Sequence, residues 1–278
     1  MIKKNAFWFS LFLILIIPAF GPCNEVVNTD QNSTIVQIGK QIDVLMDPSQ
    51  KLSLNDILSK KYQTGFKPHR KNGFNFGLTT NVIWLRFKIS DFEDLSRKKR
   101  FVLAIDKPMF PFVDLYIPIG PEKYDKISGG YLKFTKGSTL EYRYPVFKLP
   151  QNLTENRDLF LQVTPSTPTI HAAASFNLFL EDENQFQKRT WFELFFYSIM
   201  FGVLACMIFY NVFLYIFLRD KVYALYVVYI TFILTYLFLR NGFGNLIGLQ
   251  HLTPYTLFAV AIAYMFAILF SQEFLSLK

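Results

Sequence analysis

The sequence contains few of the residues that mark disulfide-rich domains or metal sites. Its 278 residues include only two cysteines, Cys23 and Cys206, and three histidines, His69, His171 and His251. One cysteine ends an N-terminal apolar segment and the other lies in a long apolar stretch, so we expect no disulfide framework. The histidines lie far apart and lack the spacing of metal ligands. We therefore expect no metal ion and no other cofactor.

Charged residues are also scarce. They make up 18% of the chain and hydrophobic residues 51%, whereas about 25% of a typical soluble protein is charged. The mean hydropathy is +0.23. The apolar excess is concentrated after Arg189, where nearly every residue is aliphatic or aromatic. This shift in composition divides the chain into a polar-surfaced first part and a membrane part.

The formal net charge of +8 on its own would suit nucleic-acid binding. The basic residues are dispersed, however, and the densest run, Arg97–Arg100, lies between two predicted strands, as expected for a solvated turn. We expect no nucleic-acid partner. The sequence also lacks a Gly-x-Ser-x-Gly elbow, an HExxH helix and a glycine-rich phosphate loop, so we expect no enzymatic activity.

The N-terminus is typical of a secretory signal. Lys3 and Lys4 precede an apolar run over Phe7–Ile17, which Pro18 follows. This run is shorter than the roughly 20 residues that a membrane span needs. We predict a signal peptide over residues 1–23, with an uncleaved anchor as the alternative, and a flexible segment over 24–41. In either case the residues that follow are exported across the membrane.

Residues 42–182 are predicted to form an extracellular β-sandwich. Apolar and mixed positions alternate over Val82–Ile89, as in a strand with one buried face. Ser53 is expected to cap a short helix over 52–58. Many short strands with little helix between them predict an all-β domain. The further strands are expected over 101–105, 112–117, 142–149, 159–163 and 175–180.

The mixed face of the strand over 82–89 suggests a site for a small polar ligand such as a sugar. An aromatic ring on a sheet can stack on a sugar ring, while nearby polar side chains bond to its hydroxyl or carboxylate groups. A structural role is the alternative and is favoured, because single aromatic residues on strands mostly serve packing. In this alternative Trp84 would cap the edge of the core or pack under a loop, and Arg86 would pair with a nearby acid. The candidate ligand-binding residues are Trp84, Arg86, Asp114, Tyr116 and Arg143.

Residues 191–278 are predicted to contain three membrane spans, over about 191–218, 222–239 and 257–275. The intervening Arg219–Lys221 leaves room only for a tight turn, so the first two spans should form an antiparallel hairpin. The acidic run Glu181–Glu183 before the first span is predicted to be a solvated linker.

Export of the β domain would place Arg219 and Lys221 in the cytoplasm, as the positive-inside rule expects. Lys188, Arg189 and Arg240 then lie on the opposite side and run against that rule. We assign the orientation from the signal segment, because export of the N-terminal domain fixes on which side of the membrane each loop lies. The protein is therefore expected to be a multi-pass protein of a bacterial inner membrane, with its N-terminal domain outside the cytoplasm.

Several segments in both halves resemble a known family, the bacterial seven-transmembrane receptors with diverse intracellular signalling modules. The first half is similar to the family's type 2 extracellular domain. Its matching segments are Leu52–Leu58, Asn75–Gly77, Val82–Phe87, Val113–Tyr116 and Tyr144–Pro150. Those of the membrane half are Phe201–Met207, Tyr210–Tyr215, Leu218–Asp220, Tyr223–Tyr226, Asn241–Gly244 and Phe274–Leu275.

The resemblance implies a jelly-roll sensor domain that binds carbohydrate or another small ligand, and a membrane domain that signals to a cytoplasmic output module. This chain holds three of the seven spans, so we expect a piece of a longer receptor, a truncated reading frame or a short form. The signalling partner would be a missing C-terminal output domain or a separate cytoplasmic protein. The alternatives are an accessory ligand-binding membrane subunit and, least favoured, a piece of a membrane enzyme or transporter.

Overall fold

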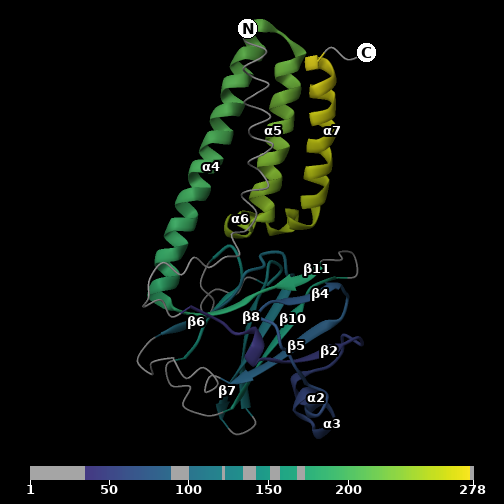
Figure 1. Ribbon diagram of the computed structural model, residues 1–278, viewed down its shortest axis with the longest axis vertical. Coiled ribbons are helices and arrows are strands. Elements are labelled where there is room, and N and C mark those ends of the chain that lie inside the picture. Colours follow the sequence, from purple (N-terminus) through teal and green to yellow (C-terminus); the bar gives the residue numbers. More distant parts are fainter. Residues whose placement is uncertain are drawn as a thin grey trace.

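A β domain lies at one end of the protein and a group of long helices at the other (Figure 1). The computed structural model describes residues 35–88, 100–120, 123–133, 142–150, 157–167 and 173–275. The predicted signal peptide over 1–23 and residues 97–99 of the basic run lie outside these ranges, as does most of the predicted flexible segment.

The β domain is built from antiparallel sheets. One has the strand order β1-β12-β6-β9, a second β3-β2-β5-β10-β7-β8, and β11 pairs with β4. The strands are β1 (Ile35–Gln37), β2 (Asp43–Asp47), β3 (Lys67–Pro68), β4 (Phe74–Leu78), β5 (Val82–Lys88), β6 (Phe101–Ile105), β7 (Phe112–Gly120), β8 (Lys123–Gly129), β9 (Val146–Lys148), β10 (Asp158–Thr164), β11 (Ala173–Phe176) and β12 (Leu178–Asp182). The short helices are η2 (Gly39–Gln41), α2 (Leu54–Leu58) and α3 (Lys60–Gln63).

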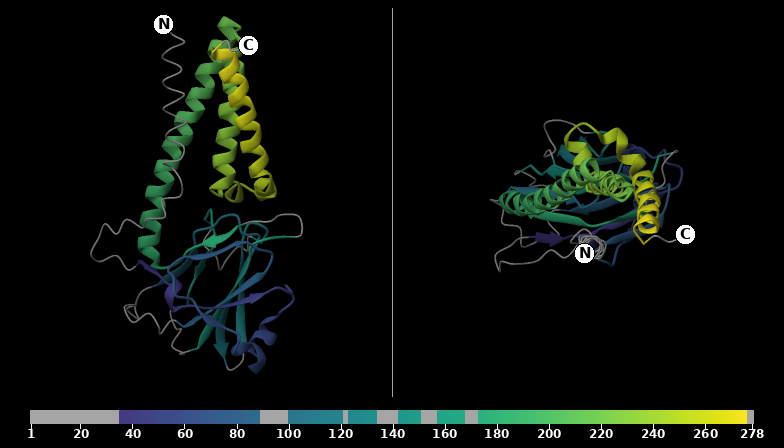
Figure 2. Two further views of the ribbon diagram at one scale, coloured as in Figure 1. Left: turned by 45° about the vertical axis from the view of Figure 1, so that its right-hand side comes forward. Right: turned by 90° about the horizontal axis from the view of Figure 1, so that it is seen from above.

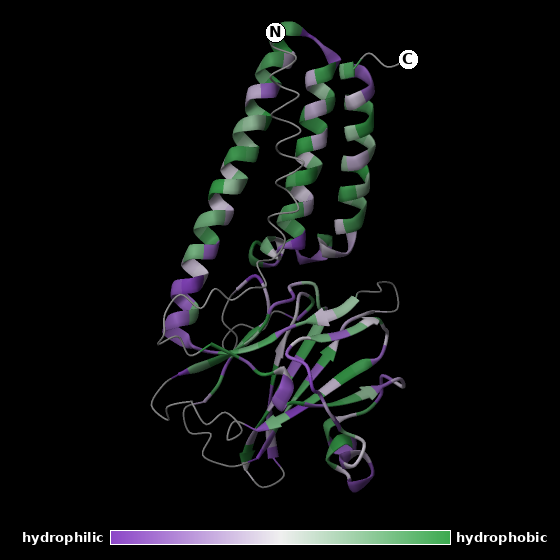
Figure 3. Ribbon diagram, viewed as in Figure 1, coloured by the Kyte–Doolittle hydropathy of each residue, from purple (hydrophilic) through white to green (hydrophobic). Residues whose placement is uncertain are grey.

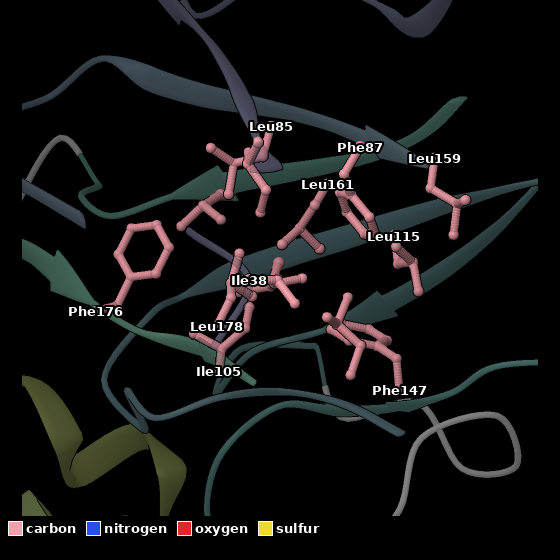
Figure 4. Packing of buried hydrophobic residues seen from close by; sticks show 14 of the residues in the cluster. Ile38, Leu85, Phe87, Ile105, Leu115, Phe147, Leu159, Leu161, Phe176 and Leu178 are labelled. Atoms are coloured by element: carbon pink, nitrogen blue, oxygen red, sulfur yellow. The ribbon is translucent and has the colours of Figure 1, made fainter. Parts of the chain in front are cut away.

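The main core lies between the four-stranded and six-stranded sheets (Figure 4). Leu85, Leu115 and Leu161 project into it from the six-stranded sheet, and Ile105 and Leu178 face them from the other. All five are fully buried, and burial of such a side chain contributes about 1.5–3 kcal/mol. The alternation of apolar residues therefore sets which face of each strand is buried, and the predicted β-sandwich is confirmed.

Several strands begin or end at residues other than those predicted from the sequence. The strand over 101–105 is confirmed as β6, but the one over 142–149 is reduced to β9, because Tyr142–Tyr144 forms bends that reach toward the helices. The strand over 175–180 is divided at Asn177, whose backbone N–H and side chain both donate to Asp106. Ser53 does cap α2, and its capping box with Asp56 is complete.

Within the described ranges, three helices are long and apolar enough to cross a membrane, as predicted (Figure 3). They are α4 (Glu183–Leu218), α5 (Lys221–Arg240) and α7 (Thr256–Leu275), and α6 (Phe243–Leu246) and the 3-10 helix η4 (Gln250–Tyr255) lie between the last two. Arg219 adopts a left-handed conformation with φ 51° and Asp220 caps α5, which makes the predicted tight hairpin.

The acidic run Glu181–Glu183 is not a solvated linker, and that prediction is wrong. Glu181 is fully buried at the end of β12, and the Asp182 carboxylate accepts hydrogen bonds from Asn184 and Gln185 as the N-cap of α4. Strand β12 thus passes directly into the first membrane helix. The sheet and the helix are joined without a flexible connection.

Helix α5 packs between α4 and α7. Leu204 of α4, Ile230 of α5 and Ala263 of α7 lie in one apolar cluster. Helix α4 diverges from the other two toward the β domain, so their ends near that domain stand apart (Figure 2). The β domain therefore meets the first part of α4 and the corner between α5 and α6, and the Tyr197 hydroxyl of α4 donates to the Asn241 side chain at that corner.

Candidate functional site

Four of the five predicted ligand-binding residues share one face of the six-stranded sheet, the face turned away from the main core. Trp84 and Arg86 lie on β5, and Asp114 and Tyr116 lie on β7. Strand β10 runs between them, and its Gln162 is directly opposite both Trp84 and Asp114. We call this surface the outer face. The strand alternation predicted from the sequence is what places these side chains together.

Trp84 is fully buried on the outer face. Its ring stacks on Tyr116 with 5.6 Å between ring centroids, and Ile57 of α2, Phe66 and Phe160 belong to the same apolar cluster. Its indole Nε1 lacks a hydrogen-bond partner among the residues that the structure describes. The packing is that of the structural alternative, and a role for Trp84 in ligand binding stays a prediction.

Arg86 pairs with an acid, as the structural alternative also has it. Its Nη2 lies 2.6 Å from Asp43 Oδ2, its Nη1 donates to Gln63, and its guanidinium covers the Phe66 ring. These contacts fix the side chain between β2, α3 and the apolar cluster. A ligand would have to share Arg86 with Asp43.

Asp114 and Tyr116 lie beside two polar residues that were not predicted as site residues. Asp114 Oδ2 is 2.7 Å from Lys126 Nζ, and the Tyr116 hydroxyl donates to Gln162 at 3.1 Å. Asp114 Oδ1 is buried and has no hydrogen-bond partner within the described ranges. Alternation along 159–163 could have indicated Gln162, but the polar sequence of β8 gave no sign of the strand that carries Lys126.

Arg143 lies apart from the other four, at the end of the β domain next to the helices. Its Nη2 is 2.6 Å from Glu193 Oε2 on α4, and that oxygen also accepts from the Tyr142 hydroxyl at 2.7 Å. The guanidinium lies over the Tyr144 ring, 5.1 Å from its centroid. Arg143 therefore connects a bend of the β domain to the first membrane helix.

Arg189 extends this set of ion pairs. Its Nη1 is 2.5 Å from Glu193 Oε1, one helical turn further along α4, and its Nη2 is 2.8 Å from Glu181 Oε2 on β12. Two arginines and two glutamates are thus joined in the order Glu181, Arg189, Glu193, Arg143. We call these four residues, with Tyr142 and Tyr144, the junction. Its opposite charges balance, which a partly buried cluster requires.

Burial raises the pKa of the Tyr142 hydroxyl to about 12. It also raises the pKa of Tyr144. Both phenols therefore keep their protons at neutral pH, so Tyr142 can donate to the Glu193 carboxylate. A neutral donor satisfies this carboxylate without adding charge to the cluster.

The corner between α5 and α6 is attached to the same part of the β domain. Arg143 Nη1 donates to the Asn241 carbonyl oxygen at 3.4 Å, and Asn245 Nδ2 donates to the carbonyl oxygens of Pro108 and Arg143. A Cβ atom at Gly242 would lie only 2.1 Å from the Arg143 carbonyl oxygen. Only glycine permits this close approach, so the α5–α6 corner and the β domain have complementary shapes at this contact.

The described residues contain no group of three His, Cys, Asp or Glu side chains that could hold a metal ion. What they offer instead is a polar outer face on the sheet and a junction with two membrane helices. The sequence did not predict the junction, because its members come from three segments, the bend at Tyr142–Tyr144, β12 and α4. Glu193 falls within the first predicted span and Arg143 within the strand predicted over 142–149, and neither pattern indicates that the two residues are partners.

Comparison with known proteins agrees with this architecture. The family model described as 7TMR-DISM extracellular 2 matches residues 39–173, and the model described as 7TM diverse intracellular signalling matches residues 193–278. The search of curated proteins found no match. Both matched models belong to membrane receptors that pair an extracellular sensor with a membrane domain, which indicates a non-enzymatic role. The chain is a multi-pass membrane protein and belongs to the family of seven-transmembrane receptors with diverse intracellular signalling modules.

Proposed function

We propose that this chain is the input part of a bacterial inner-membrane receptor. Its β domain lies outside the cytoplasm, binds a small polar ligand such as a carbohydrate, and passes the signal to the membrane helices. The chain itself catalyses no reaction. The output is made by a further C-terminal module or by a separate cytoplasmic partner.

The junction is the observation that carries this proposal. A domain that only captured ligand would need no more than a tether to the membrane. Here β12 continues into α4, and Arg143 contacts both Glu193 of α4 and Asn241 after α5. A displacement of the Tyr142–Tyr144 bend would therefore act on both helices.

Ligand binding can shift the helices only if the ligand binds one of two arrangements more tightly than the other. The diverging ends of α4 and α5 supply an element that can have two arrangements (Figure 2). Helix α4 touches α5 and α6 through Tyr197, Phe201 and Leu204, so a tilt of α4 would pivot about these contacts. We propose that the angle between these helices carries the signal.

The outer face is the proposed ligand site because it combines donors and acceptors beside aromatic rings. Lys126 is a half-exposed cation, with 42% of its side chain accessible. Gln162 carries both a donor and an acceptor and is partly exposed between Trp84 and Asp114. Hydroxyl and carboxylate groups of a sugar or sugar acid complement this set.

A ligand screen on the full chain tests this proposal. The protein in detergent would be heated with a panel of sugars and small carboxylic acids, and a ligand should raise Tm. Lys126→Gln or Gln162→Leu should weaken that ligand about tenfold, because one charged or neutral hydrogen bond is lost. Lys148→Gln is the matched control, since Lys148 lies on β9 of the four-stranded sheet with 47% of its side chain exposed and, like Lys126, pairs with a carboxylate.

Two outcomes would contradict the ligand site. In one, no member of the panel raises Tm. In the other, a ligand binds all three variants as tightly as the wild type, which would move the site away from the outer face.

A further inference from the structure

Arg240 is a cation without a carboxylate partner among the residues that the structure describes. It is the last residue of α5 and is exposed, and its guanidinium contacts the ring and hydroxyl of Tyr236 on the same helix. Arg86, Arg143 and Arg189, by contrast, each lie 2.6–2.8 Å from a carboxylate oxygen. Its charge also lies on the side that the positive-inside rule disfavours, so it needs an explanation.

The β domain brings a second cation to the same place. The Asn245 side chain donates to the Pro108 carbonyl oxygen at 3.3 Å, and a Cβ atom at Gly242 would lie 2.5 Å from Pro108 Cβ. Lys107 precedes Pro108, and Arg240 lies two residues before Gly242. The packing of Pro108 on the α5–α6 corner therefore holds Lys107 near Arg240.

The neighbouring carboxylate of Asp106 is already engaged. Its two oxygens accept hydrogen bonds from the backbone and side chain of Asn177, at 2.6 and 2.7 Å. Lys107 forms no ion pair with a carboxylate in the described ranges, although Asp106 attracts it. Burial lowers the pKa of Lys107, and the charge of Arg240 lowers it further. Two like charges are thus held together, an arrangement that a bound anion would stabilise.

The position along the helix indicates which anion. Helix α5 has 20 residues, and at 1.5 Å per residue it spans roughly 30 Å, the thickness of the hydrocarbon core. Its last residue therefore lies at the level where headgroup phosphates begin. Tyr236, one turn earlier, suits the aromatic belt at that boundary.

We propose that Lys107 and Arg240 together bind the phosphate of a lipid headgroup in the leaflet next to the β domain. The lipid would then form a third contact between the β domain and α5, beside the hydrogen bonds of Asn241 and Asn245. Receptor behaviour would depend on the anionic lipid content of that leaflet.

The test measures lipid binding to the full chain in a neutral detergent, by native mass spectrometry and by the rise in Tm. The added lipids are phosphatidylglycerol and a galactosyl diacylglycerol, which has no phosphate, and inorganic phosphate is a third arm. Phosphatidylglycerol should bind more tightly than the other two. Lys107→Gln and Arg240→Gln should each weaken it about fivefold, since each removes one cation near the surface.

Lys188→Gln is the matched control, because Lys188 is an exposed cation of α4 on the same side of the membrane. It should leave phosphatidylglycerol binding unchanged, and Arg240→Lys should retain most of it. The proposal is overturned if Lys188→Gln weakens binding as much as Arg240→Gln does, because the attraction is then a general surface effect. Equal binding of galactolipid and phosphatidylglycerol, or tighter binding of inorganic phosphate, overturns it too.

Discussion

At the scale of single residues, one strand pattern suits both a structural residue and a ligand-binding residue. Burial of the side chain and pairing of its charge distinguish the two roles. Trp84 and Arg86 alternate with apolar residues as a sugar-binding strand would require. The ring of Trp84 is nonetheless stacked on Tyr116 beneath α2, and the charge of Arg86 is paired with Asp43. Asp43 is 43 residues away in sequence, and no local pattern could have identified it as the partner.

Trp84→Ala tests the packing of this residue. Removal of a fully buried aromatic side chain should lower the free energy of unfolding by about 3–5 kcal/mol. Thermal or denaturant unfolding of the full chain in detergent would measure the loss. Trp191→Ala is the control, since Trp191 of α4 is 74% exposed and its loss should cost far less. A Trp84→Ala protein as stable as the wild type would contradict the packing described.

At the scale of elements, the capping box of α2 gives a pH-dependent contribution. Hydrogen bonds from the Ser53 hydroxyl and backbone lower the pKa of Asp56 below its ordinary value of 3.8. A carboxyl group whose pKa is lower in the folded state stabilises that state above the unfolded pKa. This contribution is lost as the pH falls through the folded-state pKa.

The difference in Tm between the wild type and Asp56→Asn should therefore be positive at neutral pH and shrink toward zero near pH 3. Scans of both proteins across this range would measure it. A difference that stayed constant, or grew as the pH fell, would show that the Asp56 carboxylate does not stabilise α2.

The α5–α6 corner depends on a glycine whose neighbours, as well as its conformation, exclude a side chain. Gly242 and Gly248 both have positive φ, 81° and 79°, but a Cβ atom meets the Arg143 carbonyl only at Gly242. Alanine at either position should cost about 1–2 kcal/mol of backbone strain. Gly242→Ala should lower Tm well beyond Gly248→Ala, because it also separates the corner from the β domain. Equal losses would argue against the close contact.

Elements with a strong apolar pattern were predictable from the sequence, and those held by long-range contacts were not. Strands β5, β6 and β10 follow from their alternating or continuous apolar residues, and the three spans follow from their length. Strand β8 is too polar to recognise, because only one of its faces meets the core, at Ile127. The bend at Tyr142–Tyr144 replaces a strand because its side chains bond to α4, a contact that no local propensity encodes.

At the scale of the whole molecule, the shift in composition near Arg189 separates a β domain from membrane helices, as the structure also does. The composition does not reveal that specific contacts join the two parts. The residues at that division, Glu181 and Arg189, are partners of each other rather than parts of a linker. With Glu193 and Arg143 they attach the sheet to α4, and Asn241 and Asn245 attach it to α5. The β domain is thereby placed to act on two helices at once.

One distance measurement tests the contact between the β domain and the membrane helices most directly. Spin labels would be placed at Lys67→Cys in the β domain and Ile247→Cys beyond α6, both exposed, with Cys23 and Cys206 changed to serine. Pulsed dipolar spectroscopy on the full chain in lipid nanodiscs then gives the distribution of distances between the β domain and the helices. Arg70→Met, at an exposed arginine far from the helices in sequence, is the control.

Arg143→Met removes the ion pair with Glu193 and the hydrogen bond to Asn241 while keeping an unbranched side chain. We predict one narrow distribution in the wild type and in Arg70→Met, and a broadened or shifted one in Arg143→Met. If Arg143→Met gives the same narrow distribution as the wild type, Arg143 does not couple the β domain to the helices, and the account of the junction is wrong.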